Sequence, residues 1–208
     1  SSYKGKTSTS SPSPHEWENA FGDAEVVFCI TITSTLSGTY NSAVIAKDIY
    51  EQNHAGRKVY VLDSLSTGPE IALFIEKIAE LIKVGFAPDD IYKTLLEYKD
   101  KTHLYFSLAS LNNFAKNGRI SPVIAAGIGL LGVRVVGKAS EEGTLLPLDK
   151  CRGEKRALKK LIDHLKECGY TDGKIFIAHN NNEAGALELK KLIENTFGIF
   201  NGTIQKTR

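Results

Sequence analysis

Four hydroxyl side chains lie between an apolar, β-branched run and a helical pattern in the first quarter of the chain. The run spans residues 26–32, and the hydroxyls follow as Ser34, Thr35, Ser37 and Thr39. Ser37 is placed to cap the helix, because its hydroxyl can accept from backbone N–H groups one turn further on. First-turn amides lack intrahelical acceptors and carry partial positive charge, so they attract anions. The pattern predicts an anion site built from neutral donors, although capping and turn roles alone also explain these residue types.

Residues 13–16, Ser-Pro-His-Glu, predict an S-x-x-E capping box at the start of a short helix, and the elements that follow alternate between strand and helix. Apolar runs at 26–32 and 58–62 are typical of buried parallel strands, and helical patterns follow each of them. Such alternation indicates a parallel sheet, in which ligands bind beyond the carboxyl ends of the strands, where Ser37 and Asp63 lie. The apolar positions are Tyr40, Ala43, Val44, Ala46 and Ile49 in the first helix, where they are expected to face the core, and Ile71, Phe74, Ile75, Ile78, Leu81 and Ile82 in the second, which Gly85 closes. A further helix is expected after Ser121. The apolar helix faces at 40–49, 71–82 and 122–131 form core by default, but they could instead line a dry tunnel.

The character of the chain changes near residues 99–102, which predicts two α/β domains at 1–99 and 100–208. The second domain is expected to contain a strand at 103–108, a hairpin at 133–148, a basic helix at 154–168, a strand at 174–178 and a helix at 183–196. The chain has no Met and stops in a strand-like stretch. We therefore expect that the N-terminal domain lacks its first strands and that the C-terminal domain is truncated at its end.

Composition narrows the class of protein. A net charge of +2 and the absence of basic clusters interleaved with aromatics argue against nucleic acid, and no apolar run is long enough to span a bilayer. Three widely spaced cysteines predict free thiols of a reducing, cytoplasmic compartment. The five histidines are too far apart for metal-ligand spacing, so no metal and no cofactor is expected.

Two other features were weighed for chemistry. Residues 127–132 match G-x-G-x-x-G, but an apolar helical pattern precedes them and a strand follows, so the context argues against a dinucleotide. His179 ends an apolar strand at the expected ligand edge and is a candidate ligand contact, with a structural histidine at a strand end as the alternative reading.

Four motifs, in order along the chain, resemble those of the DegV family of fatty-acid-binding proteins. Residues 36–43 read Leu-Ser-Gly-Thr-Tyr-Asn-Ser-Ala, and residues 9–13 are similar to the family's T-S-x-P-S. Residues 117–121 resemble G-G-R-I-S with Asn117 in place of the first glycine, and residues 150–153 resemble K-x-R-G. The similarity covers essentially the whole chain.

The resemblance implies a two-domain α/β carrier, with an N-terminal parallel sheet flanked by helices and a mixed sheet in the second domain. One long-chain fatty acid would lie between the domains, its carboxylate held by Thr9, Ser10 and Ser37, with Gly38 beside them. Arg119 would be a further contact or part of the surface shown to a partner. Such a carrier has no catalytic residue of its own and presents the acyl chain to an ATP-dependent fatty acid kinase subunit, which phosphorylates the carboxylate.

Two departures from the family leave an alternative open. The family's N-terminal strand with its Asp-Ser element and a C-terminal G-T-H-x-G-P-G segment have no counterpart here. The alternative is an α/β enzyme that acts on a small phosphorylated substrate, with the phosphate at the Ser37 helix terminus and Asp63 or His179 as general base.

Overall fold

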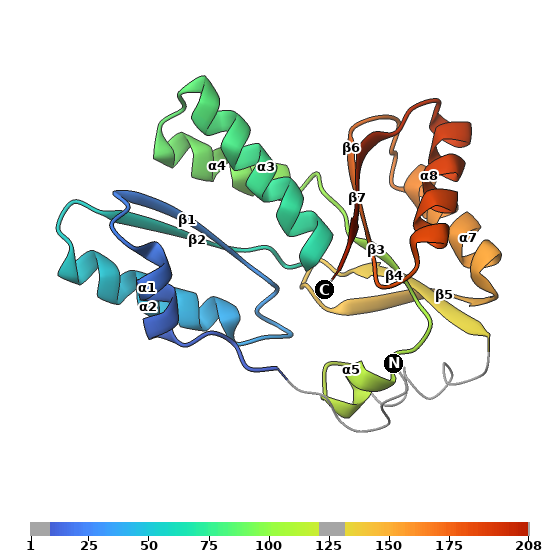
Figure 1. Cartoon of the computed structure of the whole chain (residues 1–208), viewed down its shortest axis with the longest axis horizontal. Coiled ribbons are helices and arrows are strands. Elements are labelled where there is room, and N and C mark those ends of the chain that lie inside the picture. Colours follow the sequence, from blue (N-terminus) through green and yellow to red (C-terminus); the bar gives the residue numbers. More distant parts are fainter. Residues whose placement is uncertain (1–8, 121–131, 208) are drawn as a thin grey trace. The chain divides into compact units, whose positions relative to one another are not determined.

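The computed structural model describes residues 9–120 and 132–207 (Figure 1). These residues form two compact units. The N-terminal unit comprises Thr9–Leu104 together with Ala139–Thr144. The C-terminal unit comprises the described residues of Tyr105–Lys138 and Leu145–Arg208.

The N-terminal unit is built on a parallel pair of strands with helices on both faces. Strands β1 and β2 pair in register from Val26 opposite Lys58 to Thr31 opposite Asp63, so both end at the same edge. This edge is where a parallel sheet places ligand-binding loops. The elements are α1 (Pro14–Phe21), β1 (Val26–Thr31), α2 (Thr39–Asn53), β2 (Lys58–Asp63), α3 (Gly68–Val84) and α4 (Pro88–Lys99).

Alternating strand residues divide the core of this unit into two layers. Cys29, Val59 and Val61 pack with Phe21 and the buried side of α2. Leu62 packs on the opposite face with α3 and α4, and Phe28 and Ile30 join it there. Since successive strand side chains point to opposite faces, both strands are covered on both sides, which accounts for their continuous apolar sequences.

One detail of the predicted core is wrong. Ile49 is 37% exposed, and Tyr50 is buried in its place, because Ala43, Ala46 and Tyr50 form the inward stripe of α2. Ile75 and Ile82, for which the sequence left both core and tunnel open, are 55% and 56% exposed. The inward stripe of α3 is instead Phe74, Ile78 and Leu81.

The C-terminal unit contains two separate sheets in the part that the structure describes, where one mixed sheet was expected. Strand β3 pairs antiparallel to β4 in the order β3-β4-β5, and β6 pairs parallel to β7. Strands β6 and β7 are parallel because helix α8 connects them and brings the chain back to the same end of the sheet. Strands β4 and β5 are connected by a short turn instead. The elements are β3 (Tyr105–Leu108), α5 (Asn112–Lys116), β4 (Val133–Ala139), β5 (Leu145–Arg152), α7 (Glu154–Glu167), β6 (Lys174–His179), α8 (Glu183–Phe197) and β7 (Asn201–Lys206).

Several remaining expectations have clear outcomes. All three cysteines are free thiols, as predicted. Among the described residues, no helix is both long and apolar enough to cross a bilayer. The helix expected after Ser121 and most of the 127–132 glycine motif lie outside the described residues.

Candidate functional site

Asp63, the last residue of β2, shapes the turn that follows β1. Its Oδ1 accepts from the backbone N–H of Ser34 at 3.2 Å and from that of Leu65 at 3.1 Å. Its Oδ2 also accepts from Ser34 N, at 3.3 Å. Leu65 has a left-handed φ of 51°, an unfavourable conformation for a branched side chain. Asp63 therefore holds both strand-end turns together, and its two oxygens are occupied by backbone amides.

The residues between β1 and the helix are fixed by hydrogen bonds of their own. Thr33 N donates to Ser66 O at 2.9 Å, and the Thr33 and Thr35 hydroxyl oxygens lie 2.9 Å apart. Thr35 Oγ1 donates to Gly143 O at 2.9 Å. Because a hydroxyl has one proton, Thr35 has none left for a ligand. Of the four hydroxyls in the motif, that of the exposed Thr35 is thus committed to a backbone carbonyl of the protein.

Ser37 and Thr39 form a hydroxyl pair at the start of α2. Their oxygens lie 2.7 Å apart, and Ser37 Oγ also accepts from Thr39 N at 3.3 Å. The prediction of Ser37 as N-cap is wrong by one residue, because Gly38 is the N-cap and its carbonyl accepts the first helical bond, from Ser42 N. The pair holds two protons and uses one between its members, so one remains to be donated to a ligand.

The segment from Thr9 to Ser13 lies against this helix terminus, so the structure brings the first two sequence motifs together. Ser42 Oγ donates to Pro12 O at 2.5 Å, and a Cβ added at Gly38 would be 3.5 Å from Ser11 Oγ. Thr9 and Ser10 are exposed at the start of this segment. Hydroxyl-bearing residues of the Thr9–Ser13 segment therefore lie near the N-cap position, which also has the Ser37–Thr39 pair beside it.

A capping box holds the other end of this segment. Ser13 N donates to Glu16 Oε2 at 2.7 Å, and Glu16 N donates to Ser13 Oγ at 3.3 Å, which confirms the predicted S-x-x-E box. The backbone hydrogen bond from Ser13 holds the pKa of the Glu16 carboxyl below its usual value. The box orders the segment immediately before α1, and Ser42 orders it against α2.

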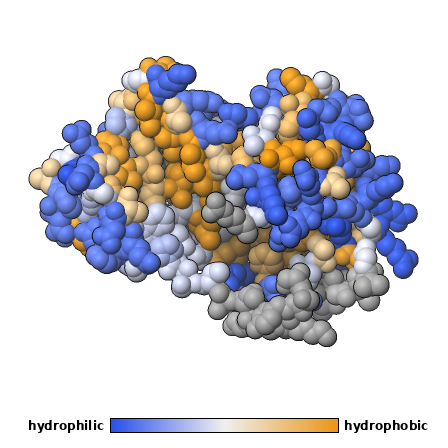
Figure 2. All heavy atoms as spheres, in the orientation of Figure 1, coloured by the Kyte–Doolittle hydropathy of each residue, from blue (hydrophilic) through white to orange (hydrophobic). Residues whose placement is uncertain are grey.

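An apolar surface lies on α3 in the same unit. Ile75 and Ile82 are seven residues apart and project from one face of the helix, with Ile71 half-buried one turn before. Figure 2 shows hydrophobic side chains gathered over α3. This helix begins just after the carboxyl end of β2, the edge that also carries the Ser37 turn.

Arg119 and His179 belong to the C-terminal unit, whereas Ser37 belongs to the N-terminal unit. Arg119 N donates to Phe114 O just after α5. His179 Nδ1 accepts from Asn182 N at 3.3 Å, and its carbonyl oxygen accepts from Thr207 N at 2.9 Å. These bonds fix the end of β6, and the role of His179 as a ligand contact stays a prediction.

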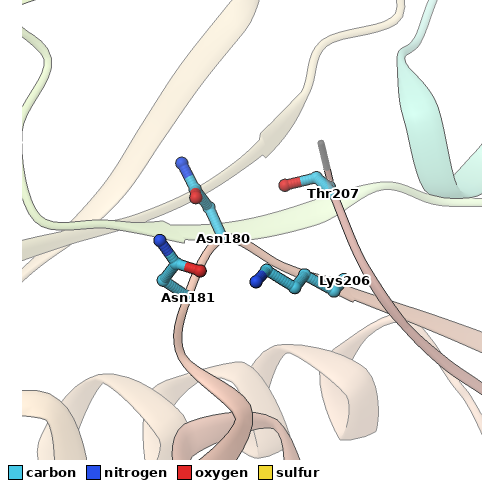
Figure 3. A pocket seen from close by; sticks show the side chains of 4 residues that line it. All are labelled: Asn180, Asn181, Lys206 and Thr207. Atoms are coloured by element: carbon cyan, nitrogen blue, oxygen red, sulfur yellow. The ribbon is translucent and has the colours of Figure 1, made fainter.

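An open pocket of about 490 Å³ lies just beyond His179, where β6 and β7 end. Figure 3 shows its four lining side chains, with that of Lys206 extending toward Asn181; the others are Asn180 and Thr207. The pocket is open, its four lining residues have polar side chains, and none of them belongs to the sequence motifs.

The two candidate general bases are both engaged with backbone amides, Asp63 with those of Ser34 and Leu65 and His179 with that of Asn182. Residues 9–120 and 132–207 contain no group of His, Cys, Asp or Glu side chains that could hold a metal ion. The arrangement around Ser37 can donate to an anion through the spare proton of the Ser37–Thr39 pair.

Comparison with known sequences identifies the family. A family model described as an uncharacterised protein of the DegV family matches residues 2–206. A DegV domain-containing protein of Streptococcus pneumoniae is 44% identical over 186 residues, which are 89% of this chain and 66% of the relative. One of Streptococcus gordonii is 40% identical over 195 residues, 92% of this chain and 69% of the relative. The chain thus spans about two thirds of the length of these relatives.

Solved structures agree in fold. A DegV family protein from Eubacterium eligens, loaded with heptadecanoic acid, has a TM-score of 0.96 at 40% identity and covers 99% of this chain and 75% of its own. The Streptococcus pneumoniae fatty acid kinase (Fak) B3 protein, loaded with linoleic acid, matches with a TM-score of 0.93 at 42% identity. The match covers 95% of this chain and 70% of the Fak B3 chain. The predicted family is confirmed: this α/β chain belongs to the DegV family.

Proposed function

We propose that the protein binds one long-chain fatty acid and holds its carboxylate at the N-terminus of α2. The observation that carries the proposal is the Ser37–Thr39 pair, whose spare proton lies beside the first-turn amides of α2. Those amides have no intrahelical acceptor and suit an anion. Thr9 and Ser10 precede the Ser11–Pro12 contact with the same helix terminus and would complete the donor set.

The choice of a fatty acid among anions is supported by the relatives. The Eubacterium eligens structure holds heptadecanoic acid and the Streptococcus pneumoniae Fak B3 structure holds linoleic acid. A Thermotoga maritima protein of the same fold, 29% identical, is described as revealing fatty acid binding function. The exposed face of α3, with Ile75 and Ile82, would lie along the tail. Each methylene buried contributes about 0.8 kcal/mol, so the tail supplies most of the affinity and the carboxylate site sets its orientation.

The bound acid would be handed to a separate kinase. The Fak B3 relative is a fatty acid kinase protein, and by analogy this chain would present the carboxylate to an ATP-dependent kinase subunit without catalysing the transfer itself. Arg119 would contribute a further carboxylate contact or part of the surface shown to that kinase, and His179 is retained as a candidate ligand contact.

Native mass spectrometry of the freshly purified protein, followed by denaturation and lipid extraction, tests the ligand class. We expect a mass excess that reappears as a free fatty acid. An empty protein that takes up neither oleate nor palmitate, but binds inorganic phosphate, would instead support the phosphate-enzyme reading.

Displacement of a dansyl-labelled fatty acid tests the site. Ser37→Ala combined with Thr9→Ala should weaken binding at least about tenfold, because hydrogen bonds to charged groups contribute about 1.5–3 kcal/mol each. Thr94→Ala, which removes a hydroxyl from α4 in the same unit, is the matched control and should bind as the unmodified protein does. Equal affinities for all three proteins would contradict the assignment of the carboxylate to this turn.

A further inference from the structure

The turn between β4 and β5 is seated against the two strand-end turns of the N-terminal unit. Gly143 is buried with a left-handed φ of 76°, and a Cβ at this position would lie 2.1 Å from Thr33 Oγ1 and 2.9 Å from Leu65 Cα. Only a glycine fits there, because the backbone itself fills the space between the two turns.

This turn, Ser140–Thr144, is braced by its own hydrogen bonds. Ser140 N donates to Thr144 O and Gly143 N to Ser140 O, both at 2.9 Å, and the Ser140 and Thr144 hydroxyl oxygens lie 2.8 Å apart. Glu141 and Glu142 are exposed at its tip. The turn therefore reaches Thr33 and Leu65 as a preformed piece of backbone.

The direction of the hydroxyl chain follows from counting protons. Thr35 has one hydroxyl proton and donates it to Gly143 O, so Thr33 must be the donor in the Thr33–Thr35 pair. The protons run from Thr33 through Thr35 to Gly143, and consecutive hydrogen bonds of this kind polarise one another. Thr33 is itself buried and tied by its amide to Ser66 O.

We infer that the Ser140–Thr144 turn holds the Ser34–Ser37 segment in the conformation that binds a carboxylate, with Gly143 and Thr35 as positioning residues. Thr35 lies two residues before Ser37, so its hydroxyl bond to Gly143 fixes the stretch of chain that leads into the Ser37–Thr39 pair. Neither Thr35 nor Gly143 touches the acid. The inference rests on the proposed fatty-acid site and adds the residues that fix its geometry.

Three variants test the inference: Thr35→Val, Thr35→Ser and Gly143→Ala. Thr35→Val keeps the shape but leaves Gly143 O and Thr33 Oγ1 without their partner, and we expect about tenfold weaker palmitate binding. Thr35→Ser keeps the donor and should bind within about twofold of the unmodified protein. Gly143→Ala, with a Cβ that collides with Thr33, should weaken binding as Thr35→Val does. Thr35→Val and Gly143→Ala act through the same contact. The protein that carries both changes should therefore bind palmitate with about the affinity of the single variant that binds it less tightly.

Methyl palmitate separates positioning of the carboxylate site from general damage to the fold. The ester lacks the anion, so its affinity should be unchanged in Thr35→Val while palmitate affinity falls. Equal losses for acid and ester, or a Gly143→Ala protein that binds palmitate normally, would overturn the inference.

Amide hydrogen exchange of the ligand-free protein tests whether the Ser140–Thr144 turn keeps the Ser34–Ser37 segment ordered when no ligand is bound. Amides within residues 34–39 should exchange faster in Thr35→Val and Gly143→Ala than in Thr35→Ser. Unchanged exchange would overturn the inference. A protein with faster exchange in these variants that binds no fatty acid at all would instead overturn the proposed function and leave the holding role standing.

Discussion

Asp63 should matter for stability through one of its oxygens, and this can be separated from any role as a base. Its Oδ1 accepts from both Ser34 N and Leu65 N, at 3.2 and 3.1 Å. An asparagine can place its carbonyl oxygen in the Oδ1 position and accept from both amides, but it loses the weaker Oδ2 contact with Ser34 N and the charge-assisted part of the bonds. Asp63→Ala removes the acceptor from both amides and leaves Leu65 in a left-handed conformation without support.

The expected magnitudes follow from those bonds. An unpaired buried donor costs about 1–3 kcal/mol, and water can reach part of this half-buried turn, so Asp63→Ala should lower the free energy of unfolding by about 2–4 kcal/mol. Asp63→Asn should cost about 1 kcal/mol, because neutral hydrogen bonds are roughly half as strong as charge-assisted ones.

Urea unfolding with a common m-value measures both differences, and palmitate affinity measured on the same proteins should follow the same order. Two variants that lose equal stability, each less than about 0.5 kcal/mol, would refute the reasoning that Asp63 organises the turn. A stable Asp63→Asn protein that had lost turnover of a phosphorylated substrate would support the enzyme reading instead.

Two further predictions concern thiols and pH. Burial raises the pKa of the Cys29 thiol to about 11 and also raises that of Cys151, whereas Cys168 is exposed. One thiol should therefore react rapidly with Ellman's reagent at pH 8, and Cys168→Ser should abolish that rapid phase; two rapid thiols would contradict the burial. The Asp149 carboxylate pairs with His164 at 2.6 Å, and this hydrogen bond holds the Asp149 pKa below its usual value. A carboxyl group whose pKa is lower in the folded than in the unfolded protein stabilises the fold at pH values above its unfolded-state pKa of about 3.9. The unmodified protein should therefore have a higher free energy of unfolding than Asp149→Asn at pH 7, and this difference should shrink as the pH falls below about 4. Urea unfolding across that range would contradict this if the difference stayed constant.

Local signals account for most of what the sequence predicted. The capping box at Ser13 and Glu16 forms as expected, and α3 ends at Gly85 with a left-handed φ of 88°. Both features depend on residues within one turn of each other, and so does the apolar run that forms β1. Such elements can be inferred from the chain without knowing what they pack against.

The pairing of strands and the choice of which helix face is buried depend on partners that are distant in sequence. The sequence alone did not predict these features correctly. An apolar pattern on α3 could not separate Phe74 from Ile75, because neighbouring positions differ by only 100° and the covering elements choose the face. The division of the C-terminal strands into two sheets likewise depends on connections rather than on strand composition. Gly143 and Thr35 are 108 residues apart, and no local signal marks their contact.

The carboxylate site shows what residue type alone can and cannot predict. Thr35, Ser37 and Thr39 are equivalent as donors in the sequence, and each could equally be a turn residue or a ligand contact. Counting protons separates them. Thr35 gives its proton to Gly143 O, whereas Ser37 and Thr39 share one bond between them and retain one proton at the start of α2. Under the proposed fatty-acid binding, substitutions that remove a hydroxyl should therefore differ in kind: loss of Ser37 would disrupt the pair proposed to donate to the acid, and loss of Thr35 would remove the contact proposed to keep that pair in place.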